Sequence, residues 1–211
     1  MKRIVILGSS GAGKSTLAKE LSSILRIKAY HLDRLFWLPG WIRKDRETRI
    51  DIMQNLVREK QWIIEGTYLK SSDLHVRMAD TIIFTDLSSL VCLLPLIKRH
   101  YRDHARSRRD IPEGCKNKLS LHQMVKVQTF PLNERRIIKQ KLRAYKAKQI
   151  IRLQSSYEVD HFLAHLKLIA DEKRNAYRTV YVAKKELDDA RILLTGERCN
   201  TKCDPPNLLF D

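Results

Sequence analysis

The chain has 211 residues, is 43% hydrophobic and 31% charged, and carries a formal net charge of +17. This length and composition fit one large α/β domain, alone or with a small appendage, and exclude collagen-like and disordered chains. No stretch approaches the roughly 20 apolar residues of a membrane-spanning helix, and the N-terminus lacks a secretory signal, so we expect a cytoplasmic protein with no membrane partner.

Short apolar runs alternate with helical patterns along most of the chain. Strands are predicted at 3–7, 27–31, 62–65, 81–85 and 149–153, and helices at 14–25, 46–59, 88–106, 120–129 and 133–147. Residues 36–41, with Pro39-Gly40, are predicted to form a loop. This alternation predicts parallel βαβ units, with a sheet that helices cover on both faces.

The C-terminal part of the sequence departs from this alternation. A short helix is predicted at 160–168, then one long, charge-balanced helix at 169–194, and the rest forms an irregular tail. We therefore expect an α/β domain that carries the functional site at 1–168, followed by a helical extension and tail at 169–211. Cys199 and Cys203 have zinc-ligand spacing, but no other Cys or His follows His165, so unpaired thiols are the favoured interpretation.

The strongest motif is a phosphate-binding loop between the first strand and the first helix. Glycines allow successive backbone N–H groups to point at one phosphate, and the helix N-terminus adds partial positive charge. Lys14 is expected to reach the β- and γ-phosphates, and the Ser15 hydroxyl is a Mg²⁺ ligand in such loops. The loop therefore predicts ATP and Mg²⁺ as cofactors. Its residues are Gly8, Ser9, Ser10, Gly11, Ala12, Gly13, Lys14, Ser15 and Thr16.

Two carboxylates end the second and third predicted strands. Because ligands collect beyond the carboxyl ends of parallel strands, Asp33 and Glu65 are expected near the transferred phosphate. Asp33 is a candidate general base for an acceptor hydroxyl, or a water-mediated Mg²⁺ contact, or an N-cap of the next segment. Glu65 is a candidate Mg²⁺ or acceptor contact, or a structural carboxylate.

The acceptor is expected to lie against residues 34–45 and 66–78. Phe36, Trp37 and Trp41 could stack on an acceptor ring or pack under the loop. Arg34 and Arg77, one in each segment, are further candidate acceptor contacts.

Most of the net charge comes from one middle stretch. Residues 98–152 hold 17 basic and 4 acidic side chains, which indicates a polyanionic ligand or a solvated helix face. Arginines recur here at helical spacing, and one or two of them could stabilise the transferred phosphate. These arginines are Arg99, Arg102, Arg106, Arg108 and Arg109.

The sequence resembles P-loop kinases of the adenylate-kinase-like type, and within them the bacterial FlaR-type proteins annotated with DNA topology modulation. The resemblance covers about residues 1–168 and rests on the phosphate loop, on His31-Leu-Asp-Arg-Leu-Phe-Trp37, and on Trp62-Ile-Ile-Glu-Gly-Thr-Tyr68. It implies a five-stranded parallel sheet of nucleoside-monophosphate-kinase type, a small helical lid at about 100–118, and Arg99 and Arg102 as lid-side arginines. Glu65-Gly-Thr-Tyr68 departs from the D-G-F-P-R of true adenylate kinases.

We expect a Mg-ATP-dependent phosphotransferase that acts on a nucleoside, a nucleotide or a related small molecule. One alternative is a nucleic-acid-associated ATPase or polynucleotide-end kinase that uses the basic 98–152 stretch. Another is a nucleotide-sensing module without catalysis. The sequence does not define the oligomeric state or the acceptor.

Overall fold

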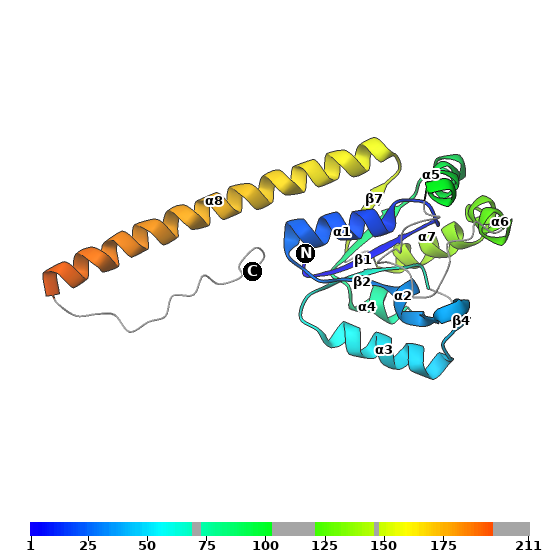
Figure 1. Cartoon of the computed structure of the whole chain (residues 1–211), viewed down its shortest axis with the longest axis horizontal. Helices are drawn as coiled ribbons and strands as arrows, with labels where there is room; N and C mark the ends of the chain where they lie inside the picture. The colour runs from blue at the N-terminus through cyan, green and yellow to red at the C-terminus, as the bar shows by residue number, and fades with distance from the viewer. Residues whose placement is uncertain (69–72, 103–120, 146–147, 196–211) are drawn as a thin grey trace. The chain divides into compact units, whose positions relative to one another are not determined.

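The computed structural model describes residues 1–68, 73–102, 121–145 and 148–195 (Figure 1). The chain divides into two compact units, Met1–His161 and Phe162–Asp211. Most of the expected lid and the tail that contains Cys199 and Cys203 lie outside the described residues. The two C-terminal helices expected from the sequence form one continuous helix, α8 (Ser156–Thr195). Among the described helices, none is both long enough and apolar enough to span a membrane.

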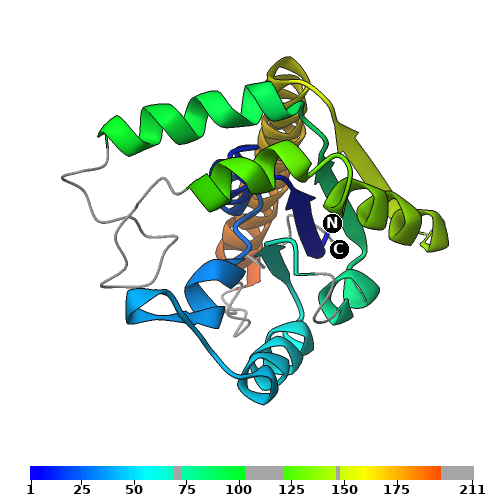
Figure 2. The same cartoon turned by 90° about the vertical axis from the view of Figure 1, so that its right-hand side faces the viewer.

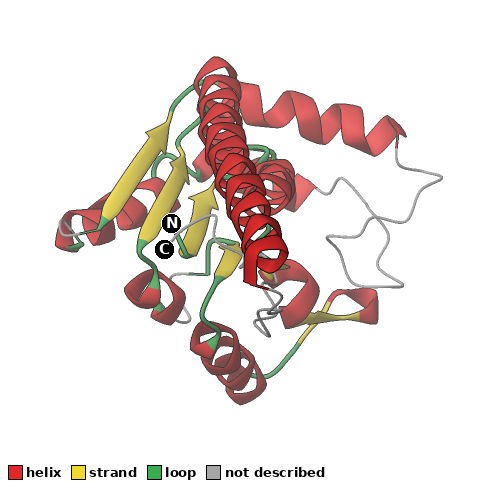
Figure 3. Ribbon diagram, turned by 90° about the vertical axis from the view of Figure 1, so that its left-hand side faces the viewer, coloured by secondary structure: helices red, strands yellow, loops and turns green. Residues whose placement is uncertain are grey.

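A five-stranded parallel sheet forms the centre of the first unit (Figure 3). Its strand order is β2-β5-β1-β6-β7, so the first strand of the chain lies in the middle. The register pairs Ile6 with Glu65 on one side of β1, and Gly8 with Thr85 on the other. The predicted α/β fold with five parallel strands is therefore confirmed. The strands are β1 (Arg3–Gly8), β2 (Ala29–His31), β5 (Trp62–Glu65), β6 (Thr81–Thr85) and β7 (Gln149–Leu153).

Helices cover both faces of this sheet. Val5 and Leu7 of β1 belong to a buried cluster that includes residues of α3 (Arg46–Arg58), α4 (Leu74–Met78) and α7 (Glu134–Ala144). Side chains alternate between the faces of a strand, so the neighbouring isoleucines of β1 point to the opposite face. There α1 (Lys14–Leu25) packs on β1, β2 and β5.

Two further helices lie next to the phosphate loop. Cys92 and Leu96 of α5 (Ser89–Arg102) form a small buried cluster with Val127 of α6 (Leu121–Thr129) and with Ala12 of the loop. Figure 2 shows α5 and α6 side by side, and the two helices contact each other. The apolar faces of these helices thus hold one wall of the loop in place.

The segment after β2 is more ordered than the loop predicted from the sequence. It contains the short helix α2 (Leu32–Phe36) and a two-stranded antiparallel hairpin, β3 (Trp37–Leu38) and β4 (Ile42–Arg43), joined by a 3-10 turn. The backbone N–H of Lys44 donates to the Phe36 carbonyl at 2.9 Å and closes the segment. Leu32 and Phe36 are both buried, and their spacing of four residues favours a single helical turn.

Candidate functional site

The phosphate loop connects the middle strand of the sheet to α1. Gly13 has φ 73°, caps α1 without a side-chain hydrogen bond, and has open space where a side chain would be. Gly11 has φ 80°, and a Cβ there would lie 2.1 Å from the carbonyl oxygen of Cys92. Both positions require glycine for their conformation. The open side at Gly13 and the first N–H groups of α1 fit an anionic phosphate.

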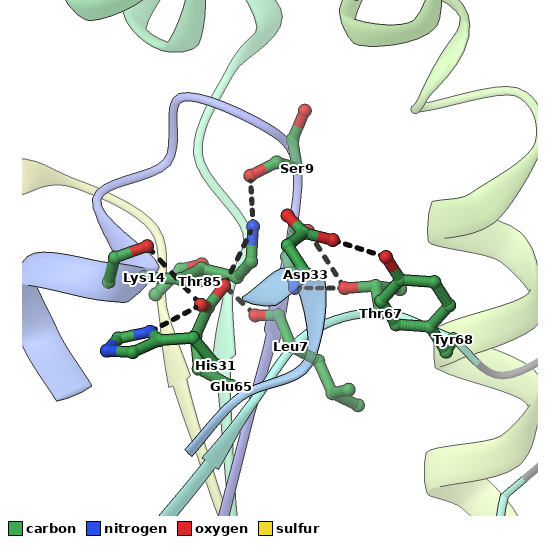
Figure 4. A network of polar contacts seen from close by, with 11 residues as sticks. Leu7, Ser9, Lys14, His31, Asp33, Glu65, Thr67, Tyr68 and Thr85 are labelled. Atoms are coloured by element: carbon green, nitrogen blue, oxygen red, sulfur yellow. Dashed lines mark hydrogen bonds and ion pairs between the residues drawn. The ribbon is translucent and has the colours of Figure 1, made fainter. Parts of the chain in front are cut away.

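Polar side chains hold the loop against the neighbouring strands (Figure 4). Thr67, just beyond β5, bridges the Gly8 backbone: it accepts from the Gly8 N–H at 3.1 Å and donates to the Gly8 carbonyl at 3.0 Å. On the other side, the Thr85 hydroxyl donates to the Leu7 carbonyl at 3.1 Å. The backbone at the start of the loop is therefore positioned by both adjacent strands.

A buried carboxylate lies beside the functional side chains of the loop. Glu65, at the end of β5, is 6% exposed. Its Oε1 lies 3.7 Å from Lys14 Nζ, and its Oε2 accepts from the Ser15 hydroxyl at 3.3 Å. Lys14 Nζ also donates to the Ser9 carbonyl at 2.8 Å. The structure thus brings together the lysine and serine of the motif with a carboxylate that is 50 residues away in sequence.

His31 completes the surroundings of this carboxylate. Its Nδ1 lies 3.1 Å from Glu65 Oε2. Burial raises the pKa of Glu65, but the His31 hydrogen bond and the Lys14 charge outweigh it, so the pKa lies below its ordinary value. Glu65 is therefore ionised at neutral pH.

The donors at this point fit a magnesium ion. Mg²⁺ prefers oxygen ligands and usually keeps several waters, with one or two protein oxygens and the substrate phosphates completing its shell. The Ser15 hydroxyl and the ionised Glu65 carboxylate are such oxygens, and they lie next to the loop that fits the phosphates. Among the described residues no cluster of three or more His, Cys, Asp or Glu forms a separate metal site.

Asp33 lies in the first turn of α2, on the exposed side of the site. Its carboxylate accepts a short hydrogen bond from the Tyr68 hydroxyl, which in turn accepts from Trp37 Nε1 at 2.9 Å. The N-cap position of α2 is His31, so Asp33 is not an N-cap. Burial raises the pKa of Tyr68, and the Asp33 charge raises it further, so the phenol keeps its proton.

The three aromatic candidates have different environments. Phe36 is 2% exposed and packs edge-on against Tyr68, with ring centroids 4.9 Å apart, so it belongs to the core. Trp37 is partly buried, and its N–H is bound to Tyr68. Trp41 is 37% exposed and contacts the Trp37 ring edge-on at 5.9 Å.

Several basic residues of the 98–152 stretch have acceptors within the protein. Arg135 and Arg152 both bind the buried Asp86 carboxylate, with Nη2 of Arg135 at 3.0 Å and Nε of Arg152 at 2.7 Å. Lys141 donates to Asp73 at 3.0 Å, and Lys148 donates to backbone carbonyls. These contacts account structurally for part of the basic excess.

The arginines predicted from the sequence as site residues have exposed side chains or side chains outside the described part of the structure. Arg34 and Arg77 are exposed. Arg99 and Arg102 lie in the last turn of α5, but their side chains are outside the described residues, as are Arg106, Arg108 and Arg109. Tyr68 is a site residue that the sequence motifs did not predict, although it ends the Glu65-Gly-Thr-Tyr68 segment that departs from the adenylate kinase pattern.

No protein-family model matches the sequence, and no curated protein matches it. Among solved structures, the shikimate kinase from Acinetobacter baumannii in complex with shikimate matches 82% of this chain and 95% of that chain, with TM-score 0.53 and 16% identity. Together with the sheet order and the phosphate loop, this match decides the fold. The fold is that of the P-loop kinases.

Two further structures are similar at lower scores. A deoxyadenosine kinase from M. mycoides, with products dCMP and a flexible dCDP bound, matches 82% of this chain and 98% of that chain, with TM-score 0.42 and 15% identity. The shikimate kinase from Aquifex aeolicus covers the same shares, with TM-score 0.46 and 19% identity. The finer likeness to FlaR-type proteins stays a prediction.

Proposed function

We propose that the protein is a Mg-ATP-dependent kinase that transfers a phosphoryl group to a nucleoside, a nucleotide or a related small molecule. The observation that carries the proposal is the convergence of Lys14, Ser15 and the ionised, buried Glu65 beside the open phosphate loop. A loop that served only as a turn would not need a buried carboxylate beside its lysine and serine. Lys14 provides a positive charge for the bound triphosphate, and the oxygens of Ser15 and Glu65 suit the Mg²⁺ that accompanies it.

In this proposal the backbone of Gly8–Thr16 surrounds the phosphates and Lys14 binds their anionic oxygens. Ser15 and Glu65 would hold Mg²⁺, directly or through water, and the bound ion would supply positive charge against the charge that develops on the transferred phosphate. Lys14 must leave the Ser9 carbonyl to reach a phosphate, and Glu65, 3.7 Å away, restrains its position.

Asp33 is proposed to orient the acceptor hydroxyl or accept its proton. Its carboxylate is exposed and held by one hydrogen bond from Tyr68, so it has free lone pairs for a second donor. Trp37, Arg34 and Arg77 are proposed acceptor contacts. Arg99 and Arg102, at the end of α5, are proposed to stabilise the transferred phosphate. A water-mediated contact of Asp33 with Mg²⁺ is the other proposed role of this side chain.

The test is phosphoryl transfer from labelled Mg-ATP to a panel of nucleosides, nucleotides and hydroxy acids. We expect a labelled acceptor with the wild type and a loss of about 10²–10³-fold in kcat with Lys14→Ala. Lys19→Ala is the matched control, because Lys19 is an exposed lysine on the same helix. Release of phosphate with no labelled acceptor across the panel would contradict a kinase, and unchanged transfer by Lys14→Ala would contradict the assigned site.

A further inference from the structure

The long helix α8 contributes none of the proposed kinase site residues. It runs without a break from Ser156 to Thr195, and its 40 residues include no Gly or Pro (Figure 1). At 1.5 Å per residue its length is roughly 60 Å. Helices of globular proteins are typically about 10–14 residues long and obtain most of their stability from the packing of an apolar face. A helix as long as α8 therefore needs packing along its side.

The C-terminal half of α8 is exposed where its side chains are described. Every residue from Asp171 to Val182 is exposed, and Val180 is 66% exposed. Leu166 and Ala170, nearer the start of the helix, are buried. Because apolar side chains gain stability when another surface removes them from water, the exposed part of α8 is the part in which a partner would have the largest effect.

A seven-residue repeat runs along this part of the helix. Positions spaced alternately three and four residues apart form one stripe, and six of its seven members are apolar. Among the other 18 residues from 171 to 195, only five are apolar. Such spacing over three heptads is typical of the a and d positions of a coiled coil. The members of the stripe are Lys173, Ala176, Val180, Ala183, Leu187, Ala190 and Leu194.

The charges that flank the stripe suit two parallel helices. All charged residues at the e positions are basic and all those at the g positions are acidic, with Lys184 and Arg191 at e, and Glu172 and Glu186 at g. In a parallel pair each g position faces the next e position of the other helix, so Glu186 of one copy meets Arg191 of the other. In an antiparallel pair e faces e and g faces g, which brings like charges together. The sequence therefore favours parallel pairing with an identical helix.

Two further features agree with this arrangement. Lys173 is the one polar member of the stripe, and a single Lys at an a position specifies register and oligomeric state at a cost in stability. On the opposite side of the helix, Arg174 and Asp171 form an exposed ion pair at 3.3 Å. These two residues occupy the outer positions b and f, where a coiled coil faces water.

Other kinds of partner fit this part of the helix less well. Residues 171–195 hold six basic and five acidic side chains, so there is no large positive excess for a nucleic-acid backbone. A helix that lies on a membrane surface has a polar face rich in Lys and Arg, whereas Asp188 and Asp189 lie on the polar face here. A second copy of the chain supplies both the matching stripe and the matching charges.

We propose that α8 forms a parallel, two-stranded coiled coil with a second copy of this chain through the stripe from Lys173 to Leu194. In the dimer Val180 is removed from water, and α8 gains packing along its length. The inference does not depend on the proposed kinase function, because no residue of the stripe belongs to the proposed site. The protein is accordingly a dimer whose contact lies in the second unit of the chain.

The first experiment measures the oligomeric state of the full chain. Sedimentation equilibrium is recorded over a wide range of micromolar concentrations. We expect the mass to approach twice the 24.8 kDa of one chain, with reversible dissociation on dilution. The mass of a single chain at every concentration would overturn the inference and would leave the stripe to the chain's own tail or to a different protein. A mass of three or more chains would overturn the two-stranded arrangement.

The second experiment tests the stripe. Val180→Glu combined with Leu187→Glu places charges at two a positions, and we expect the dissociation constant of the dimer to rise about tenfold or more. Val182→Glu is the matched control, because Val182 is an exposed valine of the same helix at an outer position, and its dimer should match that of the wild type.

Folding of these variants is checked by near-UV circular dichroism, since the three tryptophans all lie in the first unit. A dimer that persists unchanged in the double variant would overturn the inference. Equal weakening in the control would show that the contact does not follow the stripe, and would overturn it as well.

The third experiment tests the direction of pairing. Glu186→Arg or Arg191→Glu alone should weaken a parallel dimer about threefold or more, and the two reversals together should restore it. Restoration must come from the second copy, because side chains of one helix meet at spacings of three or four residues. Asp188→Arg, at an outer position, is the matched control and should leave the dissociation constant unchanged. Tighter pairing in either single variant, or no change in any of them, would overturn the parallel arrangement.

Discussion

The phosphate side and the acceptor side of the site are built in different ways. On the phosphate side, a contiguous motif is held from both flanks by the strands next to β1, and its carboxylate is 6% exposed. On the acceptor side, Asp33 and Trp37 are contributed by a short helix and a two-stranded hairpin outside the main sheet. Asp33 and Trp37 both hydrogen-bond to Tyr68, which lies just beyond β5.

This difference fits the chemistry that the proposed kinase function assigns to each side. A triphosphate and its metal ion are the same in every turnover of a kinase, so a rigid, buried arrangement of donors is preorganised for them. The acceptor must enter and leave beside the nucleotide, and residues carried by short exposed elements suit that step. Substitutions on the two sides should therefore have separable effects.

After Lys14, the largest effect is expected on the phosphate side at Glu65. Glu65→Gln keeps the shape of the side chain but removes the negative charge beside Lys14 and Ser15. We expect kcat to fall about 10²-fold and the Mg²⁺ concentration for half-maximal rate to rise, because the proposed Mg²⁺ ligand loses its negative charge. Steady-state rates over a Mg²⁺ titration measure both.

Asp51→Asn is the matched control for this experiment, because Asp51 is an exposed carboxylate of α3. It should leave the rate and its Mg²⁺ dependence unchanged. If Glu65→Gln also leaves the rate and its Mg²⁺ dependence unchanged, Glu65 is a structural carboxylate and takes no part in binding Mg²⁺.

A smaller effect is expected on the acceptor side, at Tyr68. Tyr68→Phe removes the hydroxyl that donates to Asp33 and accepts from Trp37. Hydrogen bonds to charged groups contribute about 1.5–3 kcal/mol, so we expect kcat/KM for the acceptor to fall roughly 10- to 100-fold. The KM for ATP should not change, since neither partner touches the phosphate loop in the described structure.

Tyr30→Phe provides the comparison, because the Tyr30 hydroxyl also donates to a carboxylate, that of Glu59, at 2.6 Å. Its loss should leave both Michaelis constants close to those of the wild type. An equal loss of acceptor and ATP affinity in Tyr68→Phe would mean that the two sides are not separable.

The position of the phosphate loop between β1 and α1 could be predicted from the sequence for a physical reason. The loop, its lysine and its serine are neighbours in the chain, so one motif between a strand and a helix is enough to place them. Glu65 was a candidate because it ends a buried strand, and parallel strands end at one edge of a sheet. Its contact with Ser15 required the strand order, which places β5 directly beside β1.

The acceptor side could not be predicted in the same way. β2 is separated from β1 by β5 in the sheet, so the strand that leads to Asp33 is not the one next to the loop. The hydrogen bond from Tyr68 to Asp33 joins residues that are 35 positions apart. The hairpin at 37–43 and the helix α4 contain too few residues to show a period. These features depend on tertiary packing.

The smallest effect concerns acid stability, and it arises at His75 in α4. This histidine of α4 is fully buried beneath the segment that leads from β5 to Tyr68, and burial lowers its pKa to about 4 from an ordinary value of 6.5. The folded protein therefore holds His75 neutral while the unfolded chain gains its proton first. Stability should fall as the pH drops from 6.5 towards 4, by about 3 kcal/mol in total.

Urea unfolding at several pH values between 7.5 and 4.5 measures this slope. In His75→Asn the slope across that window should be much shallower than in the wild type, even though the variant starts from a lower stability. His161→Asn, at an exposed position, should keep the wild-type slope. A steep slope that persists without His75 would assign the acid sensitivity to other groups.

Glu65 would not explain a loss of stability in this pH window, because its pKa is lowered. Its contribution to stability is lost only at pH values below the ordinary range of a carboxylate. Protonation of His75 is thus expected to destabilise the fold in mild acid before the charge arrangement at the phosphate loop is neutralised.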